Sequence, residues 1–193
     1  MYHGGMPLWN VVGLPDTGVK ESKDRIRTAI KNCGYELPSK KYIINLSPAD
    51  VRKEGTGLDL SIAVAILNGI SQIRRFNYKD VMFVGELSLD GNLKKIRGIL
   101  PMCLEAIKQG IKKVILPIEN ADEASVVEDI EVIGVKNLKE VIDYLNGKLL
   151  INPTKSNSVD SFKNSKKYKI DFYDVKGQES IKRALEVAAS GRT

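Results

Sequence analysis

The sequence is short of the residues on which several kinds of chemistry depend. Histidine occurs once, as His3, and the two cysteines, Cys33 and Cys103, stand far apart in helix-like patterns. A zinc site and a Ser-His-Asp triad are therefore not expected. We interpret the cysteines as small core residues in a reducing compartment rather than as a disulfide framework.

Long apolar runs are also lacking. No run approaches the roughly 20 residues that a helix needs to cross a bilayer, and no signal-peptide pattern opens the chain. We expect a cytoplasmic protein without a membrane partner. With 193 residues, 42% of them hydrophobic and 28% charged, the chain is predicted to form one ordinary domain with an appendage, or two small domains.

Positive charge is present but unevenly distributed. The formal net charge is +6, and six lysines with a single acidic residue lie between residues 147 and 170, where Asn and Ser are also frequent. This composition predicts a flexible basic linker over residues 148–170. The remainder of the chain is nearly neutral, so the net charge is weak evidence for a nucleic-acid partner.

The most informative stretch runs from Ser47 to Asn68. A polar loop tightens at Gly55-Thr56-Gly57, and the following run, residues 58–67, has only Asp59 and Ser61 as polar positions. Its length and alanine content favour a helix buried on nearly every side. A glycine loop that leads into a helix can hold an anion, although turning the chain is its commoner role.

Strand-like and helix-like patterns alternate over the first 147 residues. We predict strands at 8–12, 42–46, 81–84, 87–89, 93–96, 114–117 and 131–135, helices at 17–33, 58–67, 99–109 and 137–146, and a short helix that begins at Asn120. The strand at 81–84 is expected to continue through 87–89 and to turn back in a hairpin at Asp90-Gly91. This order predicts an α/β (α+β) domain with a mixed sheet.

Two further segments leave alternatives open. The predicted helix at 17–33 has a charged outer face, which is most often simply solvated but can contact a partner; its charged residues are Lys20, Glu21, Lys23, Asp24, Arg25, Arg27 and Lys31. Near the end of the chain, Ile181, Ala184, Leu185 and Ala188 share one helical face. Because a lone amphipathic helix has nothing to bury against, we interpret residues 171–193 as the first part of a second domain.

Several stretches together resemble the magnesium-chelatase-like AAA+ family, which includes bacterial competence proteins. They are VGLPDTGVKES at 12–22, LSPADVRKEGTGLDL at 46–60, VGELSLDG at 84–91, RGILPM at 97–102, LPIENADEA at 116–124 and DFYDVKGQ at 171–178. The resemblance implies that residues 6–147 form a Lon-protease-like, ChlI-type domain with the ribosomal S5 domain 2-like fold. It also implies that residues 171–193 begin an AAA+ ATPase module.

For the full-length family, the resemblance implies a hexamer that works on DNA with ATP and magnesium, notably in branch migration during natural transformation. No Walker A pattern, G-x-x-x-x-G-K-[ST], occurs in the sequence. The chain itself is therefore expected to hold no cofactor and no metal and to be no enzyme. We expect a non-catalytic accessory or assembly domain whose first partner is the AAA+ module of the same polypeptide.

One alternative is a Lon-type Ser-Lys peptidase. Similarity to those enzymes implies a serine directly after the residues that match Lys53-Glu54-Gly55-Thr56, but Gly57 stands there. It implies a lysine after Gly98-Ile99, where Leu100-Pro101 stands instead. Lys94 and Lys95 are expected to reach solvent, so no catalytic residue is predicted.

The other alternative is direct, nonspecific DNA binding. Arg52, Lys53, Arg74 and Arg75 are the candidate phosphate contacts, together with the lysine-rich linker. Such contacts confer affinity without reading the base sequence. No aromatic stacking array or recognition-helix motif accompanies them.

Overall fold

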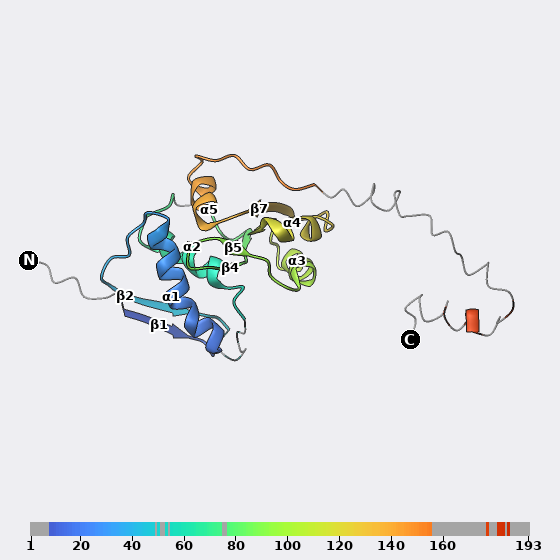
Figure 1. The fold of residues 1–193 in the computed structure, drawn as a ribbon, viewed down its shortest axis with the longest axis horizontal. Helices are drawn as coiled ribbons and strands as arrows, with labels where there is room; N and C mark the ends of the chain where they lie inside the picture. Colours follow the sequence, from blue (N-terminus) through green and yellow to red (C-terminus); the bar gives the residue numbers. More distant parts are fainter. Residues whose placement is uncertain are drawn as a thin grey trace, which may run out of the picture. The chain divides into compact units, whose positions relative to one another are not determined.

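The computed structural model describes residues 8–48, 50, 53, 55–74, 77–155, 177, 181–183 and 185. The chain divides into two compact units, residues 1–157 and residues 158–193. The first unit holds the sheets and the helices that pack on them (Figure 1). In the second, the described residues 181–183 and 185 are helical, and the side chains of Ile181 and Leu185 are about half exposed. The remaining residues of the predicted terminal helix lie outside the described residues.

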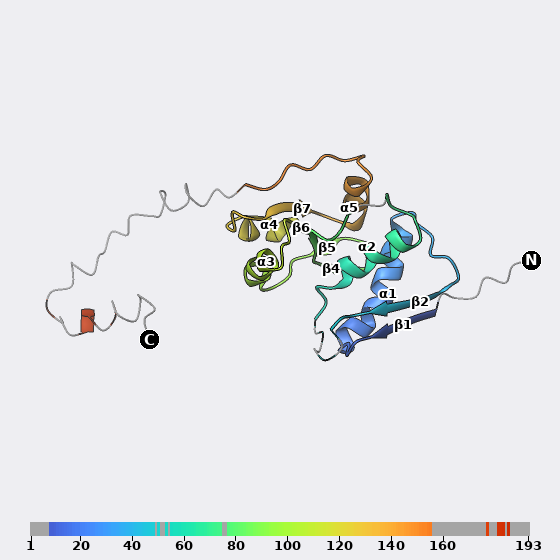
Figure 2. The same ribbon diagram turned by 180° about the vertical axis from the view of Figure 1, so that it is seen from behind.

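The first part of unit 1 is a two-stranded sheet covered by two helices. Its elements are β1 (Leu8–Val12), α1 (Thr17–Asn32), β2 (Lys41–Asn45) and α2 (Asp59–Gly69). The strands β1 and β2 pair in parallel, and the rings of Trp9 and Tyr42 lie 5.6 Å apart on the covered face. The helices α1 and α2 lie side by side (Figures 1 and 2). Asp16 caps α1 by accepting a 2.7 Å hydrogen bond from the Val19 N–H.

The second part is a three-stranded parallel sheet in the order β3-β6-β7. Its elements are β3 (Val81–Phe83), α3 (Ile99–Lys108), β6 (Lys113–Pro117), α4 (Ile118–Ala124), β7 (Glu131–Val135) and α5 (Leu138–Leu145). Alternate side chains enter different cores: Ile115 and Ile133 pack with residues of α2 and α5, whereas Val114 and Val132 pack with residues of α3 and α4. Helices therefore cover both faces, as parallel sheets require. Both cysteines are free thiols that pack in or beside these cores, as predicted.

The strand predicted over 81–89 is interrupted in the structure. β3 belongs to the parallel sheet, whereas β4 (Glu86–Leu87) pairs antiparallel with β5 (Leu93–Lys94) in a sheet of its own. The break falls at Gly85, whose N–H donates to the Gly57 carbonyl at 2.9 Å rather than to a sheet neighbour. The hairpin turn is confirmed, with Gly91 at a φ of +86°. The expected mixed sheet is thus present as three small sheets, two parallel and one antiparallel.

The short helix α4 also differs from the sequence prediction. It begins at Ile118, two residues before the predicted start, and Asn120 does not cap it. Asn120 is instead fully buried and bonds both the N–H and the carbonyl of Ile96 at 2.9 Å.

Residues 148–155 of the predicted linker belong to the first unit and pack against its other residues. The Thr154 N–H donates to the Val132 carbonyl at 2.8 Å, and Ile151 packs against the core. Residues 156–170 lie outside the described residues. In the part of the chain that is described, no helix is long and apolar enough to cross a membrane.

Candidate functional site

The glycine loop, residues 55–58, is held at both ends by buried structure. It leads directly into α2, in which Leu60, Ala63 and Leu67 have no exposed surface. On its other side, the Gly55 N–H donates to the Asp16 carboxylate, the cap of α1, at 3.0 Å. The loop therefore connects the start of α1 to the start of α2, and the predicted buried helix is confirmed.

Backbone amides at the mouth of α2 are already hydrogen-bonded within the protein. The Asp59 N–H donates to the Thr56 carbonyl at 3.2 Å, and the Leu60 N–H donates to the Gly85 carbonyl at 3.1 Å. The Gly85 N–H in turn donates to the Gly57 carbonyl. Because these donors are occupied, they are not available to an oxyanion or to another bound anion at the start of the helix.

Asp59 is the buried charge of the site, with 1% of its side chain exposed. Arg25 of α1 approaches it with two nitrogens, Nε at 2.8 Å and Nη2 at 3.1 Å, and the Leu87 N–H of β4 donates to it at 3.1 Å. Burial raises the pKa of Asp59 above its ordinary value, against the opposing effects of Arg25 and the Leu87 N–H. This cluster joins α1, α2 and β4.

The sequence pattern did not reveal the partner of Asp59. The sequence places Arg25 with the charged outer face of α1, yet only 19% of its side chain is exposed in the structure. Burial costs a charge several kcal/mol unless it is paired, so an acidic residue in a wholly apolar run is itself a signal that a cation lies nearby. The sequence does not say which cation.

The second carboxylate beside the loop is Glu86. The Thr56 hydroxyl donates to one oxygen of Glu86, and Lys94 Nζ lies 3.8 Å from the other. The Lys94 side chain is 60% exposed and Lys95 is also exposed, as predicted. An exposed ammonium paired with a carboxylate is not the desolvated, neutral amine that a Ser-Lys dyad needs.

A cavity of about 590 Å³ opens beside the loop. Its floor is largely apolar, and its rim carries charged side chains; the lining residues are Gly55, Thr56, Gly57, Leu58, Met82, Phe83, Val84, Glu86, Lys95, Ile96, Arg97 and Met102. A Cβ added at Gly57 would meet Val84 Cγ2 at 3.6 Å, an ordinary contact. Position 57, where similarity to Lon-type peptidases implies a serine, therefore has room for a side chain, but glycine stands there.

The other positions considered for catalysis also carry no suitable group. Leu100 is half-buried against the core of α3 and α4, and Pro101 is exposed. Ser61 donates to the Leu58 carbonyl at 3.1 Å, which is a structural role. Among the described residues, no group of three His, Cys, Asp or Glu side chains could hold a metal ion.

The structure does not bring together the two candidate DNA contacts that it describes, Lys53 and Arg74. Lys53 precedes α2, bonds the Leu14 carbonyl through its N–H, and donates through Nζ to the Pro48 carbonyl. Arg74 follows α2 and donates its N–H to the Asn146 side chain at 2.8 Å. The two residues thus lie beyond opposite ends of the buried helix. Arg52 and Arg75 lie outside the described residues.

Comparison with known proteins identifies the class to which this fold and loop belong. Over 135 residues, the chain is 32% identical to Lon protease 2 of Bacillus subtilis, in a match that covers 69% of this chain and 23% of that protein. The α/β arrangement with a glycine loop leading into a buried helix is therefore that of a Lon-protease-like domain.

Further comparisons identify a particular family within the class of Lon-protease-like domains. The model of the family described as Subunit ChlI of Mg-chelatase matches residues 1–120. The chain is 41% identical over 188 residues to YifB of Escherichia coli and 38% identical over 192 residues to the competence protein ComM of Haemophilus influenzae. The chain belongs to this magnesium-chelatase-like family. These matches cover 97% of the chain but only 36% and 37% of the two relatives, so it spans about a third of their length.

Proposed function

We propose that the chain is a non-catalytic accessory or assembly domain of a magnesium-chelatase-like AAA+ motor that acts on DNA. The observation that carries the proposal is the state of the glycine loop. The loop and its buried helix are retained, but Gly57 stands at the nucleophile position and the Asp59 and Leu60 amides are internally bonded. Such a loop links α1 to α2 and has no means of attacking a peptide bond.

The role in a larger motor is supported by the relatives. The chain corresponds to about a third of YifB and ComM, which leaves ample length in those proteins for an ATPase module. ComM is named as a competence protein, and we infer a related role for the protein that contains this domain. In that protein, the AAA+ module is the domain's proposed first partner, and the assembly is proposed to be a hexamer that uses ATP and magnesium.

Nucleotide binding is the first test of this assignment. The sequence has no Walker A lysine or magnesium-binding hydroxyl, so the 193-residue chain should neither bind nor hydrolyse ATP. Isothermal titration of Mg-ATP into the chain measures this directly. Saturable binding at micromolar concentration would overturn the assignment.

Peptidase activity is the second test. The chain is incubated with an unfolded protein and with a serine-reactive phosphonate, and mass spectrometry is used to look for cleavage and for covalent labelling. Neither is expected, and the variant Gly57→Ser should also remain inactive because no neutral lysine adjoins the new hydroxyl. Cleavage or labelling that disappears on Thr56→Ala would contradict the proposal, because Thr56 would then be an active nucleophile.

A further inference from the structure

We propose that the outer face of α1 is a contact surface for the phosphate backbone of nucleic acid. The surface consists of Lys20, Lys23, Arg27 and Lys31, which together form a basic stripe. It is separate from the glycine loop and from the candidate DNA contacts at either end of α2. The inference therefore goes beyond the proposed function and can hold or fail independently of it.

The stripe follows one side of a well-anchored helix. Successive members are three or four residues apart, so they stand one above another along about 16 Å of helix. The adjoining side of α1 is held in the core by Val19, Ile26 and Ile30, each with 1% exposure or less. The cations are thus presented on a rigid support rather than on a loop.

None of the four cations has an acidic partner in the described structure. Each lies more than 4.0 Å from every carboxylate oxygen of the described residues, although the exposed Glu21 and Asp24 belong to the same helix. Arg25 of the same helix differs from these four residues, because its guanidinium group pairs with the Asp59 carboxylate. The stripe cations are therefore free to exchange their counterions for phosphate groups.

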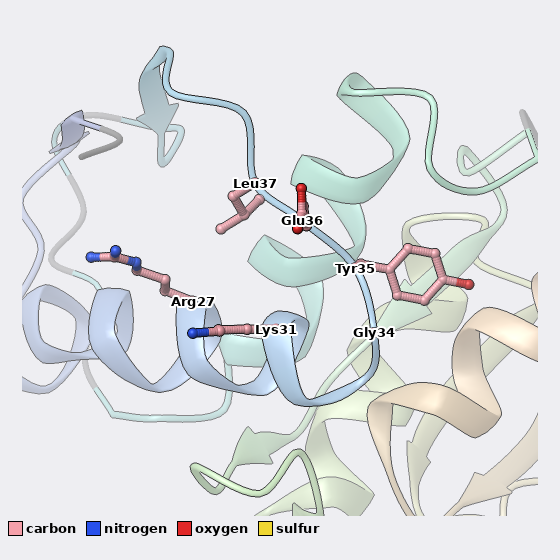
Figure 3. Close-up of a pocket in the computed structure, with 6 residues that line it drawn as sticks. All are labelled: Arg27, Lys31, Gly34, Tyr35, Glu36 and Leu37. Atoms are coloured by element: carbon pink, nitrogen blue, oxygen red, sulfur yellow. The ribbon is translucent and has the colours of Figure 1, made fainter. Parts of the chain in front are cut away.

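A groove marks the C-terminal end of the stripe. Its volume is about 430 Å³, and it lies between Arg27 and Lys31 on one side and residues 34–37 on the other. Figure 3 shows the side chains of Arg27 and Lys31 extending in the same direction from α1, while Tyr35 points the opposite way. Glu36 on the far wall is not within 4.0 Å of either cation. Two parallel cations beside an open groove are well suited to hold a phosphate.

The residues around the stripe favour nucleic acid over a lipid surface or a protein as its partner. No large apolar side chain of α1 is exposed, whereas an interfacial helix needs an apolar face to enter a lipid surface. A protein interface would likewise be expected to bury an apolar or aromatic centre, which the stripe lacks. A phosphate chain carries one charge per about 3.4 Å of each strand's axis, so one strand can meet several members of the stripe at once.

The test compares three variants of the 193-residue chain on fluorescent duplex and single-stranded DNA of unrelated sequences. The stripe variant replaces Lys20, Lys23, Arg27 and Lys31 with Gln. The control replaces Lys79, Lys112, Lys136 and Lys139, four exposed lysines elsewhere in unit 1, with Gln and so removes the same charge. A third variant replaces five lysines of the lysine-rich segment with Gln in the same way; they are Lys155, Lys163, Lys166, Lys167 and Lys169. Fluorescence anisotropy at a series of salt concentrations gives the affinity and its salt dependence.

We expect the stripe variant to lose about tenfold or more in affinity at low salt, without regard to sequence. The slope of log K against log salt on duplex DNA should fall in magnitude by roughly 3 to 4, since each lost phosphate contact removes about 0.9. The charge-matched control should change the slope by less than half as much. Urea unfolding shows whether the stripe variant remains folded, since Lys20 and Lys31 are exposed but Lys23 and Arg27 are partly buried.

Three results would overturn the inference. They are a stripe variant that binds like the parent chain, an equal loss in the charge-matched control, and a loss confined to the third variant. The last result would assign binding to the lysine-rich segment predicted from composition. None of these three results would change the outcomes expected in the nucleotide and peptidase tests of the proposed function.

Discussion

The two parallel sheets of unit 1 are built from similar residues but are covered differently. In β6 and β7 four of the five residues are buried, and helices cover both faces. In β1 and β2 the exposed and covered residues alternate, and Leu8 and Ile43 are 68% and 64% exposed on the uncovered face. Apolar composition alone therefore does not tell how a strand is buried; the helices around it decide.

This difference separates stability from surface function within one unit. The covered sheet contributes side chains to both cores, so changes there should be costly. The glycine loop and the outer face of α1 lie in the other part, where side chains reach solvent. Pairs of similar substitutions, one at a buried position and one at an exposed position, therefore test whether stability depends mainly on the buried residues.

The largest effect is expected at Asp59, which joins α1, α2 and β4. Asp59→Ala leaves the Arg25 guanidinium without its partner and should lower the free energy of unfolding by about 3–5 kcal/mol. Glu86→Ala, at the other carboxylate beside the loop, should cost at most about 1 kcal/mol because its ion pair with Lys94 is solvent-exposed. Urea denaturation followed by circular dichroism compares them. Equal losses would show that the Arg25–Asp59 pair does not hold α1 and α2 together.

The next effect compares one isoleucine from each sheet. Ile133→Ala in β7 removes a fully buried side chain and should cost about 2–5 kcal/mol, through lost burial and the cavity left behind. Ile43→Ala in β2 should remain within about 0.5 kcal/mol, since that side chain is mostly exposed. A comparable loss at Ile43 would mean that the open face of β1 and β2 is covered in solution. Sedimentation of the parent chain would then reveal whether a second copy covers it.

A third comparison uses two asparagines. Asn120→Ala should cost about 1–3 kcal/mol, because it leaves the buried N–H and carbonyl of Ile96 without partners. Asn10→Ala on the exposed face of β1 should change stability by less than about 0.5 kcal/mol. Chemical denaturation provides both values. Hydrogen exchange at the Ile96 amide gives a local check, with faster exchange expected only in the Asn120 variant.

The smallest effect is expected at the exposed hairpin turn. The Ser88 hydroxyl and the Asn92 N–H donate to Asp90 and hold the pKa of its carboxyl below the ordinary value of 3.8. The resulting stabilisation is fully present above the unfolded-state pKa and is lost as the pH falls through the lower folded-state pKa. The difference in stability between the parent chain and Asp90→Asn should therefore shrink between about pH 6 and about pH 2. A difference that grows on acidification would reverse the assigned direction.

Much of the secondary structure could be predicted because its signals are local. The helices α1 and α5, capped by Asp16 and Asn137, lie at the expected places, and Asp90-Gly91 forms the expected hairpin. The apolar run after the glycine loop is buried as its composition requires. Each of these features depends on a few neighbouring residues, such as a capping side chain, a turn pair or a continuous apolar segment.

The errors arose where a distant segment changes a local pattern. The alternation through 81–89 is that of one strand, but Gly85 bonds Gly57 of the glycine loop and divides it. Asn120 has the residue type of a helix cap, but the backbone of Ile96 binds its side chain. Neither partner is adjacent in sequence, so no local pattern could indicate it.

The sequence by itself determined the order of the elements, the buried helix, and the absence of a nucleophile at Gly57 and of a Walker A loop. These follow from the residue types in short windows. Only the tertiary structure decided that Asp59 pairs with Arg25, that the Asp59 and Leu60 amides are occupied, and that the stripe cations have no acidic partner among the described residues. Those facts depend on which side chains and backbone groups lie within a few ångströms after folding, because ion pairs and hydrogen bonds act over contact distances and not along the chain.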